Sequence, residues 1–305
     1  MLRFVLKRLL QAIVTLWAIV TLTFVLTKSV PGDPFSQEKQ ISESTRAQLN
    51  AYYGLDQPVV VQYGLLFQRL FKGDLGPSMR QPGTTVNEIV RDSFPVSITL
   101  GVLSLAIALA VGIPAGVLAA ARKNTFFDYL PMGFAMAGIC LPTFVLGPIL
   151  SYVFGLKLQW LSVSGWSRST DWILPASTLG LFYAAYVARI VRGGMLEVLG
   201  QDFIRTARAK GVGSLRLITR HTLRGGLMPL VSFLGPAIAG LVSGSFVIEN
   251  IFRVPGLGKH FVQAAQAADY SVVIGTTLLF GSLIIVLNFL VDLIQALMDP
   301  RQRIS

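Results

Sequence analysis

Six long apolar stretches restrict this chain to a membrane-spanning fold. A helix that crosses a bilayer needs about 20 mostly apolar residues. Stretches of this kind cover residues 9–26, 95–121, 129–154, 173–190, 227–248 and 272–298. Only 13% of the residues are charged and the mean hydropathy is +0.63, whereas a soluble domain carries about 25% charged residues. The sequence therefore excludes a water-soluble globular enzyme and predicts an all-α integral membrane protein with six transmembrane helices.

Basic residues are distributed unequally between the two sides of these predicted helices. One side holds fifteen of the 26 basic residues: Arg3, Lys7, Arg8, Arg122, Lys123, Arg189, Arg192, Arg205, Arg208, Lys210, Arg216, Arg220, Arg224, Arg301 and Arg303. Short cytoplasmic loops carry an excess of Lys and Arg. We therefore predict that the N and C termini are both cytoplasmic. The net charge of +11 then reflects topology, and no basic stretch is interleaved with the stacking aromatics that nucleic-acid binding uses.

The order of the apolar stretches predicts three regions. Residues 1–29 form an N-terminal signal-anchor helix, which is not cleaved because no small-residue cleavage site follows it. Residues 30–94 form an extracytoplasmic helical loop. Residues 95–305 form a five-helix core with a cytoplasmic loop at about 193–226.

Helix signals also occur within the predicted extracytoplasmic loop. Ser44 or Thr45 is expected to begin a helix that runs to Tyr53 and ends at Gly54. Asp56-Gln57-Pro58 is expected to begin a second helix, over 59–71, that ends at Gly73. The loop is therefore predicted to be a small helical cap.

Residues that could hold a metal or a nucleotide are scarce. One cysteine, Cys140, cannot form an intrachain disulfide, and with His221 and His260 it cannot complete a four-ligand zinc site. The segment 256–260 lacks the first glycine and the final Ser or Thr of a phosphate-binding loop. We predict no metal site, no cofactor in this chain and no enzymatic activity of its own.

The predicted cytoplasmic loop carries its basic residues between two short helix signals. Asp202 is expected to cap a helix that Gly211 ends, because glycine adopts the left-handed conformation after a helix at little cost. Ser214 is expected to cap a second helix. In that helix three arginines would share one face: Arg216, Arg220 and Arg224. Such a projection suits docking to a partner protein, and the alternative is a basic loop that only fixes topology.

A seven-residue run in this loop resembles the coupling motif of ABC importer permeases, Glu-Ala-Ala followed after three residues by Gly. The run is Arg205-Thr206-Ala207-Arg208-Ala209-Lys210-Gly211. Ala207 matches the central Ala, Gly211 matches the Gly, and Arg205 replaces the Glu, as it does in the peptide-importer branch. Further matching segments are 31–34, 53–58, 73–78, 92–97, 249–258 and 298–301. Over almost its whole length the chain is similar to the first permease subunit of dipeptide, oligopeptide and nickel ABC importers, most closely the oligopeptide type.

This resemblance implies an ABC importer type I permease fold in a bacterial inner or plasma membrane. The implied partners are a second homologous permease, two cytosolic P-loop ATPases that use ATP and Mg²⁺, and an extracytoplasmic solute-binding protein that delivers a peptide. The chain would form half of the translocation pathway. The residues implied to couple it to an ATPase are Arg205, Thr206, Ala207, Arg208, Ala209, Lys210, Gly211 and Arg216.

The fifth apolar stretch is rich in small residues that let helices pack closely. We predict that five of them line the pathway or the permease–permease interface: Ser232, Gly235, Gly240, Ser243 and Gly244. Pro236 would weaken the same helix and free carbonyl groups toward a cavity. The alternative is ordinary packing within the chain.

Three charged residues near the ends of predicted membrane helices are further candidates. Glu249 and Arg253 are four residues apart and are predicted to form an outer gate or a binding-protein contact, or else a solvated ion pair. Asp292 lies within the last apolar stretch, where a carboxylate is costly. A partner arginine or a water-filled crevice explains Asp292 more simply than a role in transport does.

Three alternatives to oligopeptide import stay open at this point. Nickel or another peptide-like solute is the alternative substrate within the same family. An ion-coupled secondary transporter would usually show intramembrane carboxylates in both halves, and this chain offers Asp292 alone. A membrane scaffold or sensor would function independently of an ATPase.

Overall fold

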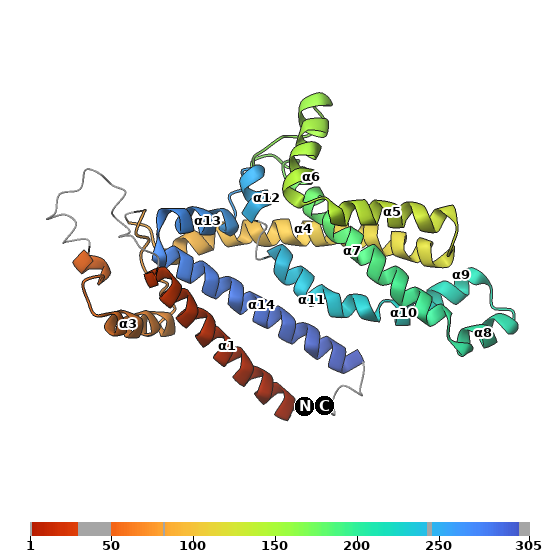
Figure 1. Cartoon of the computed structure of the whole chain (residues 1–305), viewed down its shortest axis with the longest axis horizontal. Helices are drawn as coiled ribbons and strands as arrows, with labels where there is room; N and C mark the ends of the chain where they lie inside the picture. Colours follow the sequence, from red (N-terminus) through yellow and green to blue (C-terminus); the bar gives the residue numbers. More distant parts are fainter. Residues whose placement is uncertain (1, 30–49, 82, 243–245, 299–305) are drawn as a thin grey trace. The chain divides into compact units, whose positions relative to one another are not determined.

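The computed structural model of the chain describes residues 2–29, 50–81, 83–242 and 246–298 (Figure 1). Within these ranges the chain is built from helices, and its one β-type contact is an isolated bridge between Pro77 and Thr85. The chain divides into two compact units. The first comprises Met1–Val96 and Gly256–Ile285, and the second comprises Ser97–Pro255 and Val286–Ser305.

The first unit contains α1, α3 and α13 together with the beginnings of two long helices, α4 and α14. Their bounds are Leu2–Ser29 for α1, Val59–Phe71 for α3, Val86–Ala121 for α4, Leu257–Ala267 for α13 and Tyr270–Met298 for α14. Apolar side chains from α4, α13 and α14 form its core: Val86, Ile89, Leu257, Ala264 and Val272. Helix α13 was not predicted, because its sequence lies between two apolar stretches and was assigned to a loop.

The helices predicted in the 30–94 loop are confirmed where the structure describes them. Helix α3 covers the predicted residues, and Gly73 follows it at a φ of +71°. Residues 50–53 are helical and Gly54 ends them at a φ of +69°. The predicted start of that helix, at Ser44 or Thr45, lies outside the described residues.

Helix α4 begins nine residues before the predicted start at residue 95, so the proposed boundary between loop and core falls inside a helix. A reciprocal capping box explains the early start. The Thr85 backbone N–H donates to Glu88 Oε2 at 2.8 Å, and the Glu88 backbone N–H donates to Thr85 Oγ1 at 3.2 Å. This Thr-x-x-Glu pattern satisfies N–H groups that the first turn of a helix leaves unpaired. The sequence Thr85-Val86-Asn87-Glu88 carries this capping signal ahead of the apolar stretch.

Asp269 anchors the segment before α4 onto the start of α14. Its carboxylate is 2% exposed and accepts hydrogen bonds from the Ser78 hydroxyl and from the backbone N–H groups of Met79 and Arg80. Its second oxygen accepts the N–H of Val272, in the first turn of α14. One side chain therefore caps a membrane helix and fixes a loop about 190 residues away in the sequence.

We predict that Asp269→Asn destabilises the first unit. The amide presents N–H groups where the carboxylate accepted several donors, and a buried donor left without an acceptor costs about 1–3 kcal/mol. A lower midpoint of thermal unfolding in detergent, with faster proteolysis between α3 and α4, is the expected result. The exposed Asp56 is the control position, and Asp56→Asn should leave both readouts unchanged. Equal behaviour of the two variants would contradict this role for Asp269.

The second unit contains the remaining helices and the later parts of α4 and α14. The bounds are α5 Phe126–Cys140, α6 Thr143–Leu150, η1 Ser151–Lys157, α7 Ile173–Leu199, α8 Asp202–Ala209, α9 Ser214–Arg216, η2 Leu217–Thr222, α10 Leu223–Gly226, α11 Met228–Val242 and α12 Phe246–Ile251. Helix α7 is central, because α5, α6, α10 and α11 all pack on it. The main core cluster is Ala120, Val187, Val191, Met195 and Leu230.

Glycines let α4 approach α7 closely. A Cβ atom placed on Gly112 would lie 2.7 Å from the Cβ of Val187, and one placed on Gly116 would lie 2.8 Å from the Cβ of Val191. Any larger residue at either position must push the helices apart. This is the small-residue packing that membrane helices use in place of a hydrophobic driving force.

The third apolar stretch, predicted as one membrane helix, is broken. Helices α5 and α6 meet at an angle of 107° across Leu141 and Pro142. Proline cannot donate a backbone hydrogen bond and pushes the preceding residue toward an extended conformation, and Leu141 has a ψ of 113°.

By length and composition, five described helices can cross a membrane, or six if the bent pair α5–α6 counts as one span. The five overlap the first, second, fourth, fifth and sixth predicted stretches. The count of six spans and the cytoplasmic side of both termini stay predictions.

Candidate functional site

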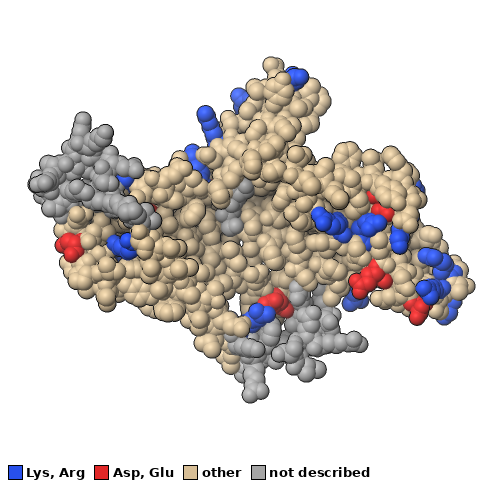
Figure 2. Space-filling model, in the orientation of Figure 1, with Lys and Arg blue, Asp and Glu red and all other residues tan. Residues whose placement is uncertain are grey.

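The segment between α7 and α11 forms a compact projection, here called the α7–α11 loop and defined as residues 200–227. It consists of α8, a glycine corner, and the continuous helical run of α9, η2 and α10. Figure 2 shows basic side chains gathered over the end of the second unit that carries this loop. All seven residues of the predicted coupling run lie in it, on α8 and the corner.

The corner after α8 is a Schellman motif centred on Gly211. The Val212 N–H donates to the Ala207 carbonyl at 3.2 Å, and the Gly211 N–H donates to the Arg208 carbonyl at 3.0 Å. Gly211 has a φ of +78°, a conformation that only glycine adopts without strain. The predicted end of the helix at Gly211 is confirmed. The backbone conformation of this corner therefore favours glycine at position 211, whether or not a partner binds there.

Apolar contacts hold this corner against α7. Ile204 of α8 and Leu217 of η2 are 1% and 3% exposed, and they pack with Val198 near the end of α7. Ala207 and Val212 pack against the same cluster, which is the hydrophobic contact that usually accompanies a Schellman motif. Helix α8 is therefore in direct apolar contact with the end of α7.

A second contact joins the loop to α7 at a pair of glycines. A Cβ on Gly194 would overlap the carbonyl oxygen of Gly226, and one on Gly226 would lie 2.6 Å from the Met195 sulfur. Only glycine at both positions allows α10 to lie this close to α7. The loop is thus held at both ends by the same helix.

The exposed surface of the loop is basic and also carries two large apolar side chains. Arg205, Arg208, Lys210 and Arg216 are exposed, as are the apolar side chains of Phe203 and Leu215, which are 49% and 77% exposed. A hollow of about 590 Å³ opens beside them, lined by residues that include Glu197, Phe203, Arg220 and Arg224. The loop therefore presents an exposed phenylalanine and several arginines beside a hollow, and both residue types are enriched in protein interfaces.

Two predicted details of this loop are wrong. Asp202 and Ser214 are the first residues of their helices, and the N-cap positions belong to Gln201 and Gly213, which make no side-chain capping bond. The three arginines do not lie along one regular α-helical face, because residues 217–222 form a π-helix. Arg220 and Arg224 line the hollow, and Arg216 is not among its lining residues.

An ion pair between α5 and α7 was not predicted from the sequence. Arg192 donates from Nε to Asp128 Oδ1 at 2.6 Å and from Nη2 to Asp128 Oδ2 at 2.8 Å. Asp128 is 1% exposed and also accepts the Asn124 N–H at 2.9 Å. The sequence signal was an arginine near the end of the fourth apolar stretch and an aspartate at the start of the third. Their pairing holds α5 on the helix that carries the α7–α11 loop.

The small residues predicted on α11 fall into two groups. Gly235 is buried, and a Cβ there would lie 3.1 Å from Val291 of α14, which is the packing alternative. Ser232, Pro236 and Gly240 follow each other at intervals of four and are exposed, although a Cβ on Gly240 would meet the Tyr183 hydroxyl at 2.6 Å. Ser243 and Gly244 lie outside the described residues. The pathway assignment stays a prediction for Ser232 and Gly240.

A cluster of aromatic rings joins α7 to α11 and was not predicted. Phe182, Tyr183 and Tyr186 of α7 lie beside Phe233 of α11, with ring centroids 5.3 to 6.5 Å apart. All four side chains are partly exposed. They place π-faces and phenol groups next to α11, the helix with the exposed small residues.

The structure separates the environments of Glu249 and Arg253. Glu249 is fully buried and accepts a hydrogen bond from the Ser97 hydroxyl at 2.9 Å. Arg253 is exposed on a left-handed residue with a φ of +54°. The predicted solvated ion pair is therefore wrong. The Glu249 carboxylate is also inaccessible to a binding protein, because none of its surface is exposed. Arg253 stays a candidate for such a contact.

Comparisons with known proteins match almost the whole chain. Residues 112–304 match the family model of the inner membrane component of binding-protein-dependent transport systems, and residues 1–101 match the model of its N-terminal part. The oligopeptide permease protein OppB of Salmonella typhimurium is 45% identical, and OppB of Haemophilus influenzae is 43% identical, each over 99% of this chain and 100% of the relative. The dipeptide permease protein DppB of Bacillus subtilis is 41% identical over 99% of this chain and 98% of its own length.

Solved structures agree on the fold. A chain of the MetNI methionine ABC transporter superposes with a TM-score of 0.58 at 17% identity, over 69% of this chain and 96% of the other. A chain of an amino acid ABC transporter gives a TM-score of 0.55 at 14% identity, over 68% of this chain and 94% of the other. The chain belongs to the inner membrane components of binding-protein-dependent ABC transport systems, among the oligopeptide and dipeptide permeases.

Proposed function

We propose that this permease subunit imports oligopeptides and forms half of the pathway with a second, homologous permease. Two cytosolic ATPases would bind ATP and Mg²⁺, and an extracytoplasmic binding protein would deliver the peptide. Relatives named as oligopeptide permeases, matched over their full length, support the substrate. Family membership argues against the ion-coupled transporter and the scaffold, and nickel or another peptide-like solute stays the alternative cargo.

The α7–α11 loop is the observation that carries the coupling proposal. Its surface is basic and partly apolar, its corner is fixed by Gly211, and its core is packed on α7. An ATPase docked on α8 would therefore move α7 as a lever. Because α5, α6 and α11 pack on α7, such a movement would be passed to the helices that carry the aromatic cluster and the exposed face of α11.

A mild-detergent pull-down of the tagged chain from native membranes, followed by mass spectrometry, tests this assembly. We expect a second permease and P-loop ATPases in stoichiometric amounts. Uptake of a labelled oligopeptide and of radioactive nickel, in cells with and without the chain, then distinguishes the cargo. Recovery of the chain alone, under conditions that keep a known ABC importer intact, would contradict the proposal.

Asp292 is the one charged candidate in the last membrane helix that we expect to be dispensable. Its side chain is half-buried near the end of α14 and interacts with another residue. A structural role is therefore sufficient to explain its presence in the helix. Asp292→Asn keeps the size and the polarity of the side chain and should leave peptide uptake within about threefold of wild type, at the level expected for one polar contact. Complete loss of uptake at normal expression would show that the charge itself takes part in transport.

A further inference from the structure

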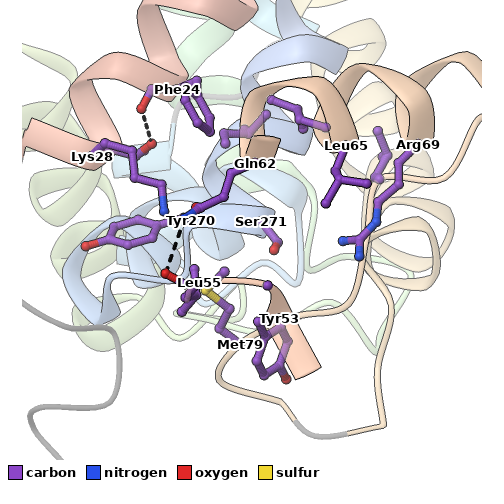
Figure 3. Close-up of a pocket in the computed structure, with 15 residues that line it drawn as sticks. Phe24, Lys28, Tyr53, Leu55, Gln62, Leu65, Arg69, Met79, Tyr270 and Ser271 are labelled. Carbon is purple, nitrogen blue, oxygen red and sulfur yellow. Dashed lines mark hydrogen bonds between the residues drawn. The ribbon is translucent and has the colours of Figure 1, made fainter. Parts of the chain in front are cut away.

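A small cavity of about 90 Å³ in the first unit lies where the end of α1, helix α3 and the start of α14 meet (Figure 3). Phe24 and Lys28 of α1, Gln62 and Arg69 of α3, and Tyr270 of α14 are among its lining residues. In Figure 3 the head groups of Lys28 and Arg69 point toward the cavity from different helices. None of the transport features described above uses this cavity.

Specific contacts form the walls of the cavity. The Tyr63 hydroxyl and the Thr21 hydroxyl are 2.7 Å apart, and the rings of Tyr63 and Phe24 pack edge to face at 5.4 Å. Gln62 Nε2 donates to the carbonyls of Gln57 and Leu55. Helix α3 is therefore fixed to the last turns of α1, and the positions of the two cationic residues are set by packed helices.

The charge in this cavity is of one sign. Lys28 Nζ lies 5.9 Å from the ring centroids of both Phe24 and Tyr270. No Asp or Glu is among the lining residues, and within the part of the chain that the structure describes no carboxylate forms an ion pair with Lys28 or Arg69. Two cations that line one cavity without a counter-charge favour an anionic ligand, and a phosphate oxygen suits both a lysine and an arginine.

The surroundings place this cavity at the level of the lipid headgroups. Lys28 follows the apolar stretch 9–26 by two residues, and the apolar part of α1 spans about 27 Å at 1.5 Å per residue, close to the thickness of the hydrocarbon core. The neighbouring side chains Leu22, Val25 and Leu26 are 50–61% exposed. A lysine just beyond the end of an apolar membrane helix is expected to extend its ammonium group into the headgroup region.

Helix α3 supplies an apolar surface beside the two cations. Nine of its 13 residues are Val, Leu, Phe or Tyr, none is buried, and Arg69 is its one charged residue. Val60 and Phe71 are 81% and 88% exposed. An apolar helix with a basic residue, next to a membrane span, is typical of a segment that lies in the membrane interface.

We propose that this cavity binds the phosphodiester headgroup of an anionic phospholipid, such as phosphatidylglycerol, in the leaflet at the Ser29 end of α1. Lys28 and Arg69 hold the phosphate, Tyr270 and Phe24 enclose the ammonium group of Lys28, and the acyl chains lie along the exposed apolar residues of α1 and α3. Basic pockets between membrane helices bind anionic headgroups at the cytoplasmic face of membrane proteins, and the same phosphate chemistry serves at the opposite face, where the predicted topology places the Ser29 end of α1. The bound lipid would fix α3, and with it the loop before α4, at the membrane surface.

Lipid retention by the complex purified through a tag on this chain tests the site. The complex is exchanged into detergent containing equal phosphatidylglycerol and phosphatidylcholine, and the lipids that stay bound are counted by native mass spectrometry. Wild type should retain phosphatidylglycerol preferentially. Lys28→Gln with Arg69→Gln should lower that retention about tenfold, since each cation near an anionic headgroup contributes a several-fold gain. Lys28→Arg with Arg69→Lys keeps the charge and should retain at least half.

The matched control is Lys72→Gln with Arg91→Gln, which removes two exposed cations of the same unit that do not line the cavity. Retention by this control should stay within twofold of wild type. If the Gln pair at the cavity prevents assembly, Arg69→Gln alone is measured and should lose more than half of the bound phosphatidylglycerol. Equal retention of the two lipids, or an equal loss in the control, would overturn the proposal. So would displacement of the lipid by excess inorganic phosphate or soluble peptide, which would identify a site for soluble anions.

Discussion

Gly211→Trp is expected to reduce oligopeptide uptake more than tenfold while membrane insertion stays normal. Two physical effects combine at this position. The φ of +78° strains any residue with a Cβ by about 1 kcal/mol or more, and the open space around the Cβ position means that an indole ring would project from the corner. An ATPase that docks on α8 and this corner would meet that ring. Uptake of a labelled peptide, with membrane levels measured by immunoblot, is the readout.

Two further variants separate bulk from backbone strain. Gly211→Asn tolerates the left-handed conformation better than other residues and adds little bulk, so uptake within about threefold of wild type is expected. Gly73→Trp is the matched control, because Gly73 also follows a helix, has a φ of +71° and has open space around its Cβ position. We expect the ATPase to co-purify with Gly73→Trp and to be lost from Gly211→Trp. Normal uptake by Gly211→Trp would overturn the coupling role of this corner.

Local sequence signals predicted the parts of this fold that depend on local physics. An apolar stretch of sufficient length is by itself a membrane helix, which is why α1, α4, α7 and α14 were found. Glycines 54, 73 and 211 were found as helix ends because a left-handed residue after a helix favours glycine. The same reasoning missed the capping box at Thr85 because an apolar stretch, rather than a polar cap, was taken as the start of α4.

Features that depend on distant contacts could not be predicted in this way. The break at Leu141 and Pro142 depends on how α5 and α6 pack on α7, since proline alone is compatible with a kink or a break. The π-helix at 217–222 has no local signal in this sequence. Glu249 looked like a surface residue at the end of a membrane helix, yet the fold buries it against Ser97, 152 residues away in the sequence. A carboxylate and a hydroxyl this far apart in the sequence form no recognisable motif from which their contact could be predicted.

The ion pair between Asp128 and Arg192 should make the largest single side-chain contribution to the stability of the second unit. Removing one partner of a buried pair typically costs about 3–5 kcal/mol, because the other charge is left without compensation. Asp128 is 1% exposed and Arg192 is 28% exposed. We therefore expect Arg192→Gln, which strands the more deeply buried charge, to destabilise more than Asp128→Asn. For a unit of this size, 3 kcal/mol corresponds to a fall in Tm of about 6–12 °C.

A double-mutant cycle tests this pair directly, with thermal unfolding of the purified protein as the readout. Asp128→Asn with Arg192→Gln removes both charges and should recover part of the stability that Arg192→Gln loses, since no buried charge is then left alone. The exposed pair Asp202–Arg205 is the control: its side chains are 94% and 77% exposed at 3.4 Å, and the matched Asn and Gln substitutions should leave Tm unchanged. Additive losses at Asp128 and Arg192 would mean that the two side chains act independently. The link between α5 and α7 would then rest on apolar packing.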